Sequence, residues 1–317
     1  MTYLGVDTSN YRTSLAFYDA DSRTARLSSR LLSVADGERG LRQSDALFAH
    51  TKALPELTRS LFEERPASGV KAVGVSARPR DAEGSYMPCF LAGIAAAQAF
   101  SSAYGVPLHT FSHQQGHIAA AAYGADALGL LRQPFLAWHL SGGTTELLYV
   151  TSDAQGIPQE TIIGGTTDIA AGQLVDRAGV AMGLNFPSGP ALETLTEGAP
   201  PQKGFAVRVE DARFSLSGME NKVTALLASG TPQAEVATFV IATITRMILT
   251  ATRQALERHP GLPVLCAGGV MSNRRIQAAM HDAFGAYFAP PAYASDNALG
   301  PALLAAIQEG EDVWTRR

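Results

Sequence analysis

The chain starts the same pattern twice, and this repeat constrains its fold more than any other feature. Apolar runs at 3–6 and 14–18 flank a polar turn, and after Pro134 apolar runs at 135–140 and 146–150 flank a turn of Ser, Gly, Gly, Thr and Thr. Each pattern is typical of a β-hairpin. Helical and strand patterns alternate after each hairpin, so the sequence predicts an α/β protein with two similar lobes facing a cleft.

The two expected lobes cover residues 1–125 and 126–317, with a helical insertion in the second and the last helix packing back toward the cleft. Further strands are expected at 27–34, 70–76, 108–111, 162–163 and 264–267, and helices at 44–64, 90–104, 113–123, 168–182, 219–228 and 234–259, near Asn273 and from Asp296. The hairpin turns would face each other across the cleft. Their small residues let backbone N–H groups approach a phosphate.

Composition narrows the class of protein. The 317 residues suit two domains, and a net charge of −4 gives no overall basic field that would by itself indicate nucleic acid. The two cysteines lie far apart, which excludes a disulfide framework and fits a reducing cytosol. The N-terminus lacks a signal-peptide pattern, and the Ala-rich apolar stretch at 89–100 is too short to span a bilayer. We therefore expect a cytoplasmic protein without membrane association.

A histidine pair is the strongest chemical signal. His113 and His117 are four residues apart, so they share one face of the expected helix and could bind one metal ion together. Solvated or core histidines are the alternative at this spacing. Gln114 stands where an H-E-x-x-H metalloprotease needs a glutamate base, which disfavours that class, and Gly116 weakens the helix.

Seven segments together resemble one family. They read GVDTS at 5–9, HQQGH at 113–117, LSGGTTEL at 140–147, AAGQLVDRAGVAMGLNFPSGP at 170–190, FSLSGMENK at 214–222, AGGVMSN at 267–273 and SDNA at 295–298. In this order they resemble the TsaD family, formerly labelled O-sialoglycoprotein endopeptidases or glycoproteases. The resemblance implies the two-lobed, actin-like and sugar-kinase-like ATPase fold, which agrees with the duplicated pattern.

The resemblance also implies residue roles. His113, His117 and Asp296 would bind iron or zinc, and Asp7, Ser9 and Ser141 would be catalytic. An adenine nucleotide (threonylcarbamoyl-AMP, AMP or ATP) would contact Leu140, Ser141, Gly142, Gly143, Thr144, Asp176, Gly189 and Asn273. The implied reaction transfers a threonylcarbamoyl group from threonylcarbamoyl-AMP to an adenosine of tRNA. The implied partners are tRNA and a subunit of related fold.

Several positions depart from the family pattern. The family turn E-T-S-C-D-E-T is replaced by residues 7–13, where Arg12 reverses a charge. Residues 78–81 replace G-P-G-L, Thr144 replaces the histidine of S-G-G-H-T, and Gln173 replaces a glutamate. These changes indicate a divergent paralogue. It would carry out the family transfer or a related acyl or carbamoyl transfer, or it would be a non-catalytic nucleotide- and metal-binding partner or regulator.

A phosphotransferase or ATPase is less favoured, because two histidines and an aspartate are not the usual ligands of magnesium. The introduced arginines Arg12, Arg78 and Arg80 are expected near the cleft mouth. There they would bind an additional anion, or pair with Asp81 and Glu83 and narrow the opening, or simply remain on a solvated surface.

Overall fold

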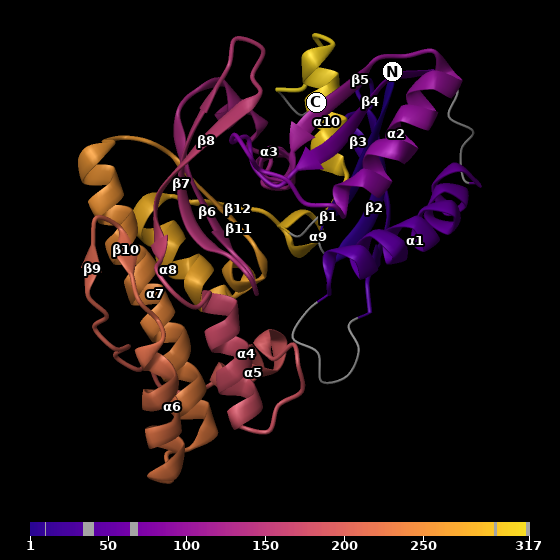
Figure 1. Cartoon of the computed structure of the whole chain (residues 1–317). Helices are drawn as coiled ribbons and strands as arrows, with labels where there is room; N and C mark the ends of the chain where they lie inside the picture. Colours follow the sequence, from indigo (N-terminus) through magenta and orange to yellow (C-terminus); the bar gives the residue numbers. More distant parts are fainter. Residues whose placement is uncertain (10, 34–40, 64–68, 295–296, 315–317) are drawn as a thin grey trace. The chain divides into compact units, whose positions relative to one another are not determined.

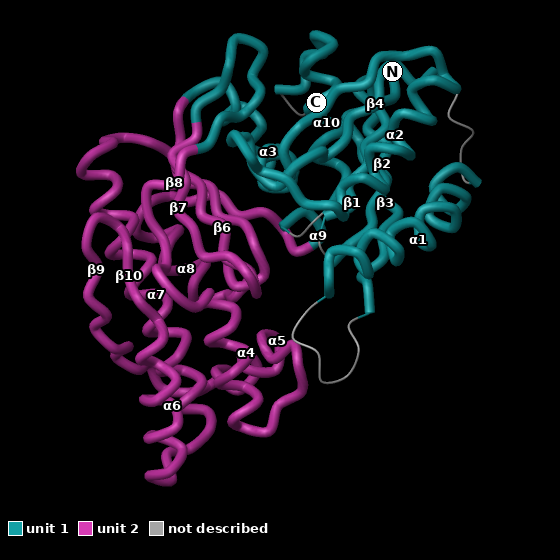
Figure 2. Tube along the Cα trace, in the orientation of Figure 1, with its two compact units in different colours: residues 1–133, 151–160, 292–317 teal, residues 134–150, 161–291 magenta. Residues whose placement is uncertain are grey.

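The computed structural model describes residues 1–9, 11–33, 41–63, 69–294 and 297–314 (Figure 1). The chain forms two compact units (Figure 2). Unit 1 comprises Met1–Gln133, Thr151–Glu160 and Ala292–Arg317, and unit 2 comprises Pro134–Val150 and Thr161–Pro291. The expected domain boundary after residue 125 stays a prediction. The compact units group residues 151–160 and the C-terminal segment with the N-terminal part of the chain.

Unit 1 is built on a five-stranded sheet with the order β3-β2-β1-β4-β5. Strands β1 to β3 are antiparallel, and β4 and β5 continue the sheet parallel to β1. The elements are β1 (Thr2–Ser9), β2 (Arg12–Asp19), β3 (Thr24–Leu31), α1 (Gln43–Glu63), β4 (Val70–Arg78), α2 (Phe90–Tyr104), β5 (Leu108–Ser112), α3 (His113–Gly124), the 3-10 helix η1 (Leu128–Arg132) and α10 (Leu299–Gln308).

The two faces of this sheet follow from the alternation of side chains along β1. Leu4 and Val6 belong to the apolar core formed with α1 and α2. Gly5 points to the opposite face, where a Cβ would lie 1.9 Å from the carbonyl oxygen of Ala298 at the start of α10. Because side chains alternate with a period of two, Asp7 lies on the α10 face.

Unit 2 contains a seven-stranded sheet with the order β12-β11-β6-β7-β8-β10-β9. Five neighbours, β8-β7-β6-β11-β12, repeat the order of the unit 1 sheet, so the repeated sequence pattern corresponds to a repeated topology. The elements are β6 (Phe135–Leu140), β7 (Thr145–Ser152), β8 (Pro158–Thr166), α4 (Ala171–Ala181), α5 (Gly189–Thr196), β9 (Val209–Glu210), β10 (Arg213–Phe214), α6 (Gly218–Ala228), α7 (Gln233–Arg258), β11 (Val264–Ala267), η2 (Gly269–Ser272), α8 (Arg274–Phe284) and β12 (Tyr287–Phe288). The short α9 (Pro291–Ala294) begins at the last residue of unit 2 and continues in unit 1.

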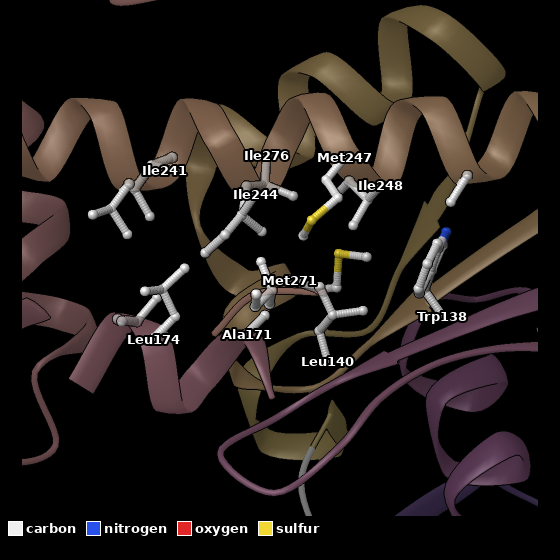
Figure 3. Close-up of a cluster of buried hydrophobic side chains, with 14 of the residues drawn as sticks. Trp138, Leu140, Ala171, Leu174, Ile241, Ile244, Met247, Ile248, Met271 and Ile276 are labelled. Carbon is white, nitrogen blue, oxygen red and sulfur yellow. The ribbon is translucent and has the colours of Figure 1, made fainter. Parts of the chain in front are cut away.

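Helix α7 supplies much of the unit 2 core. Its residues Ile241, Ile244 and Ile248 pack with Trp138 and Leu140 of β6 (Figure 3). By length and hydropathy α7 could cross a membrane, the one such helix among the described residues, and 56% of its most apolar window is buried within the protein. A core helix passes the same test of length and composition, so this finding alone indicates nothing beyond a long apolar helix.

Most predicted elements are present, with shifted ends. The helix expected at 168–182 covers Ala171–Ala181, and the separate α5 and the short β9–β10 hairpin were not predicted. The last helix begins at Leu299 rather than at residue 296. Asn297 explains this later start, because its side-chain oxygen accepts the backbone N–H of Leu299 at 3.1 Å and satisfies one of the first donors of the helix.

Candidate metal and nucleotide half-sites

The first half-site lies at one edge of the unit 1 sheet. Strands β1, β4 and β5 are parallel neighbours, so their carboxyl ends meet at the same edge. Asp7 lies near the end of β1, Ser76 near the end of β4, and His113 directly after β5. This is the edge at which open α/β sheets usually bind ligands.

Asp7 is the centre of a buried hydrogen-bond network. Its side chain is 1% exposed. Oδ1 accepts the backbone N–H of Ser9 at 2.9 Å, and Oδ2 accepts the Ser76 hydroxyl at 2.5 Å. The same Oδ2 lies 2.8 Å from Nδ1 of His113. The network connects Asp7 and Ser9, two of the predicted catalytic residues, with the predicted metal ligand His113.

The histidine pair is held at the start of α3 by a capping box. Ser112 Oγ accepts the N–H of Gln115 at 3.1 Å, and Gln115 Oε1 accepts the N–H of Ser112 at 2.8 Å. The rings of His113 and His117 lie with centroids 4.3 Å apart and an interplanar angle of 71°. Two adjacent imidazoles, one of them supported by a carboxylate, are a donor set that fits a transition metal.

The third predicted metal ligand, Asp296, lies outside the described residues, and so does Asn10 of the first turn. Within the described ranges, no group of three His, Cys, Asp or Glu side chains is arranged to bind a metal. Ala298, two residues after Asp296, donates its N–H to Ser14 Oγ at 3.0 Å. Ser14 is the register partner of Asp7 in the β1–β2 ladder. Ala298 therefore lies at the same edge of the unit 1 sheet as Asp7.

Gly116, which weakens the propensity of α3, has a packing role. A Cβ on Gly300 of α10 would lie 2.1 Å from the carbonyl oxygen of Gly116, and this atom belongs to the backbone. Helices α3 and α10 therefore touch backbone to backbone at these glycines. The contact fixes the first turn of α10 beside the helix that carries the histidines.

Sequence reasoning missed His50 of α1, which is fully buried. Its Nδ1 lies 2.8 Å from Thr13 Oγ1 on β2, and burial lowers its pKa to about 4. The imidazole is therefore neutral at neutral pH. No motif in the sequence distinguishes this histidine from the others.

The second half-site lies at the equivalent edge of unit 2. Strands β6 and β11 are parallel neighbours, and the turn after β6 lies beside Gly268 after β11. In the β6–β7 turn, Ser141 N–H donates to the Thr144 carbonyl at 2.8 Å, and Ser141 Oγ accepts the N–H of Thr144 at 3.1 Å. Gly142 and Gly143 are exposed, and a Cβ on either would meet no atom within 4 Å. A ligand can therefore approach their backbone.

Predicted ligand-lining residue Leu140 is buried, as part of the core. A Cβ on Gly268, whose φ is 98°, would lie 2.0 Å from the Leu140 carbonyl oxygen. Glycine is required here by both the positive φ and the close approach. Leu140 thus shapes the turn through its backbone.

Helix α4 begins directly against the β6–β7 turn. Thr145 Oγ1 accepts the N–H of Ala171 at 2.7 Å, and a Cβ on Gly172 would lie 2.4 Å from the Ser141 carbonyl oxygen. Gln173 Oε1 accepts the N–H of Ala170 at 3.1 Å, so the amide provides the N-terminal acceptor that a glutamate would provide. Asp176 follows Gly172 by four residues and lies on the same helix face, about 6 Å further along the axis.

Asp176 also anchors the segment before α5. Its Oδ1 accepts the N–H of Ser188 at 2.8 Å, and partial burial raises its pKa above the ordinary aspartate value. Gly189 follows directly, and a Cβ there would meet no atom within 4 Å. Asn273 caps α8, since its Oδ1 accepts the N–H groups of Arg275 and Ile276 at 3.1 and 3.3 Å.

Asp168 was not predicted as a site residue, although it lies two residues before the 170–190 motif and binds the 214–222 motif. It accepts hydrogen bonds from the Ser215 hydroxyl at 2.5 Å and from the N–H groups of Leu216 and Ser217 at 2.8 and 3.2 Å. Burial opposes ionisation, but these donors hold the pKa of Asp168 well below its usual range. The Ser-Leu-Ser segment is therefore a carboxylate-binding loop within unit 2.

The introduced arginines have partners on unit 1. Arg78 Nη2 lies 2.5 Å from Asp81 Oδ1, so of the expected alternatives this residue forms the ion pair with Asp81. Arg12 Nη1 donates to Ser29 Oγ at 3.1 Å. The backbone N–H of Arg80 donates to Ser85 Oγ at 3.0 Å and closes the loop after β4.

Two α/β units with the same strand order, each with a polar turn after its first strand, define a protein of the actin-like, sugar-kinase-like ATPase fold. Solved structures share this fold at low sequence identity. Full-length HypF in its phosphate- and nucleotide-bound form is 12% identical with a TM-score of 0.61, over 99% of this chain and 47% of that one. The activator of the 2-hydroxyisocaproyl-CoA dehydratase from Clostridium difficile is 14% identical with a TM-score of 0.52, over 98% and 95%.

Within this fold class, the chain belongs to the TsaD family, described as tRNA N6-adenosine threonylcarbamoyltransferase, whose model matches residues 35–303. The relative of that name from Streptococcus thermophilus is 32% identical over 231 residues, covering 69% of this chain and 66% of the relative. The one from Geobacillus thermodenitrificans is 32% identical over 224 residues, covering 68% and 62%. The matches thus span just under two thirds of the length of these relatives.

Proposed function

We propose that this protein is a metal-dependent transferase that moves a threonylcarbamoyl group from threonylcarbamoyl-AMP to an adenosine of tRNA, or performs a closely related acyl or carbamoyl transfer. The observation that carries the proposal is the adjacent His113–His117 pair, in which His117 is buried and His113 is hydrogen-bonded to the buried Asp7. Family membership supplies the substrate class.

In this proposal His113 and His117 bind the metal, with Asp296 as the third ligand. A metal bound there would act as a Lewis acid on the acyl-phosphate end of the donor. Iron and zinc both suit two imidazoles and one carboxylate. The chain's own contribution is to hold the two imidazoles adjacent at the start of α3.

The nucleotide would be bound by unit 2. The open Gly142–Gly143 turn offers backbone N–H groups to the phosphate, Asp176 accepts the ribose hydroxyls, and Gly189 leaves room for the nucleoside. Because the Asn273 oxygen caps α8, its amide nitrogen is the group that would serve the base or ribose. The catalytic roles of Ser9 and Ser141 stay predictions.

The transfer itself exchanges one bond for another. The N6 amino group of the acceptor adenosine attacks the carbamoyl carbon, the bond from that carbon to the phosphate oxygen breaks, and AMP leaves with the electron pair. The amino group loses one proton to the surrounding base or solvent. The backbone N–H of the exposed Gly142 would stabilise the negative charge on the carbonyl oxygen, because the N–H groups of Ser141 and Thr144 already donate within the turn.

The setting of this reaction is part of the proposal. The acceptor would be tRNA, and a subunit of related fold would be a partner, in the cytoplasm and away from membranes. The net charge of −4 provides no overall attraction for tRNA, so binding would depend on local arginines such as those near the first hairpin.

A non-catalytic nucleotide- and metal-binding partner or regulator is the alternative. It is favoured by the first hairpin, where Arg12 bonds to Ser29 in place of an acid that could serve a substrate. Thr144 adds to this, because it replaces a histidine in the glycine turn. These changes concern the reacting centre and leave the histidine pair intact.

One set of assays separates the two functions. The full chain is purified, its metal is quantified by mass spectrometry, and it is supplied with threonylcarbamoyl-AMP and tRNA. The variants are His117→Ala and, as a matched control, His281→Ala, whose side chain is 70% exposed. We expect transfer by the wild type and the control, with loss of both metal and transfer in His117→Ala. Metal and nucleotide binding without any transfer would support the regulator, and unchanged metal content in His117→Ala would refute the metal site.

A further inference from the structure

We infer that Asp7 is a positioning residue: its carboxylate fixes the tautomer and ring orientation of His113 so that Nε2 binds the metal, and Ser76 fixes the carboxylate in turn. This inference rests on the proposed metal binding and assigns Asp7 a role other than contact with substrate. It is carried by the hydrogen bonds and the burial at the end of β1.

The carboxylate is already committed. Oδ1 accepts the N–H of Ser9, and Oδ2 accepts the Ser76 hydroxyl and lies 2.8 Å from His113 Nδ1. With a side chain that is 1% exposed, Asp7 offers little surface for a substrate to touch. The functional group that Asp7 contacts directly is the imidazole of His113.

The chemistry of an imidazole next to a carboxylate follows directly. An ionised carboxylate is only an acceptor, so the proton of the neutral His113 ring is held on Nδ1, where it donates to Asp7. The other nitrogen, Nε2, then carries the lone pair that binds a metal. A carboxylate in this position also raises the basicity of the ligand, and its loss typically lowers metal affinity about 10–100-fold.

The backbone around Asp7 makes this arrangement rigid. Gly5, two residues earlier, packs directly against the Ala298 carbonyl of α10. Thr8, the next residue, accepts the N–H of Gly93 at 3.0 Å and donates to the Cys89 carbonyl at 3.1 Å at the start of α2. Asp7 is thus fixed from both faces of the sheet, so the imidazole that it holds is oriented before any metal binds.

The ring of His113 has a second contact that supports this orientation. The Phe90 ring lies with its centroid 6.1 Å from that of His113, at an interplanar angle of 56°. Phe90 belongs to a small apolar cluster with Leu32, Ala46 and Cys89. One side of the imidazole is therefore confined by packing while Asp7 confines Nδ1.

The test uses Asp7→Asn, which keeps the shape of the side chain and removes its charge. Ser76→Ala removes one donor to Asp7, and Asp282→Asn is the matched control because the Asp282 side chain is 83% exposed. Affinity for Zn²⁺ or Co²⁺ is measured by competition with a chelator. The His113 tautomer is read in the metal-free full chain from the ¹⁵N shifts of its ring nitrogens.

We expect Asp7→Asn to lower metal affinity about 10–100-fold and to move the His113 proton from Nδ1 toward Nε2, because the asparagine amide can donate to Nδ1. Ser76→Ala should lower affinity less, and Asp282→Asn should match the wild type. Equal metal affinity and an equal tautomer in Asp7→Asn would overturn the inference while leaving the proposed function intact. If His117→Ala bound as much metal as the wild type, the proposed function and the inference would be overturned together.

Discussion

Glu160, whose carboxylate oxygens are buried, and the buried His50 belong to unit 1 and should give this protein opposing pH dependences of stability that nearly cancel. Glu160 lies at the start of β8, and both of its carboxylate oxygens are buried. His50 is fully buried in α1, and its Nε2 has no hydrogen-bond partner among the described residues. Both groups are more stable neutral than charged in the folded chain.

The magnitude for Glu160 follows from its pKa. Burial, with a smaller effect of the Asp81 charge, raises this pKa from 4.5 to about 7. The folded protein therefore holds a proton between pH 4.5 and 7 that the unfolded chain has released. At about 1.4 kcal/mol per pKa unit, the free energy of unfolding gains about 3 kcal/mol as the pH falls through this range.

His50 acts in the opposite direction. Burial lowers its pKa from 6.5 to about 4, so the unfolded chain binds a proton between these values and the folded protein does not. The free energy of unfolding therefore falls by about 3 kcal/mol as the pH decreases from 6.5 to 4. The two windows overlap, and the wild type should show little change from these two groups between pH 6.5 and 4.5.

The assay is urea unfolding at a series of pH values from 4.5 to 7.5 for the wild type, Glu160→Gln, His50→Asn and the double variant. Contributions to the free energy of unfolding that are common to all four proteins cancel when each variant is compared with the wild type. Glu160→Gln should lose stability relative to the wild type as the pH falls, and His50→Asn should gain it. Parallel pH profiles for Glu160→Gln and the wild type would show that Glu160 is not held neutral by burial, and the reasoning would be refuted.

Three further predictions concern the half-sites. Asp176→Ala should weaken AMP binding, measured by calorimetry, by about 1–3 kcal/mol, and equal affinity would remove Asp176 from the nucleotide site. Gly300→Ala should destabilise the protein by about 1–3 kcal/mol in urea unfolding because its Cβ would meet backbone at 2.1 Å, whereas Gly129→Ala, with no atom within 4 Å, should not; similar values for the two would contradict the helix contact. Replacing Tyr11 and Arg12 by acids should raise the rate of transfer to tRNA. A wild type that already works at the rate of an ordinary family member would contradict this prediction.

The sequence was sufficient to predict the architecture because hydrophobic alternation and turn chemistry are local. The strand at 70–76 and the helix at 90–104 were both placed to within two residues at each end. The sequence did not predict in the same way that residues 151–160 and 292–317 belong to unit 1. It depends on contacts such as that of Gln115 Nε2 with the Pro158 carbonyl at 2.8 Å, which join residues distant in the sequence.

The candidate site was predictable only where the sequence spacing of two residues indicates that they can bind a ligand together. Two histidines four residues apart predicted an adjacent pair, and their rings do lie side by side. The bond between Asp7 and His113 joins residues 106 positions apart, and no local pattern indicates it. Asp168 was overlooked for the same reason, since its donors at residues 215–217 belong to another motif.

The repeated topology explains why the two half-sites differ in chemistry. The turn after β1 and the turn after β6 occupy equivalent places in the two sheets, each next to a parallel strand. Near the end of β1 the chain carries the buried Asp7 carboxylate, whose bonds run to Ser76 and His113, which suits the support of a metal ligand. After β6 it carries exposed glycines whose backbone is open, which suits an anion. A substitution of Gly143 by aspartate should therefore abolish phosphate affinity while leaving metal affinity unchanged, and a parallel loss of both would show that the two half-sites are not chemically separate.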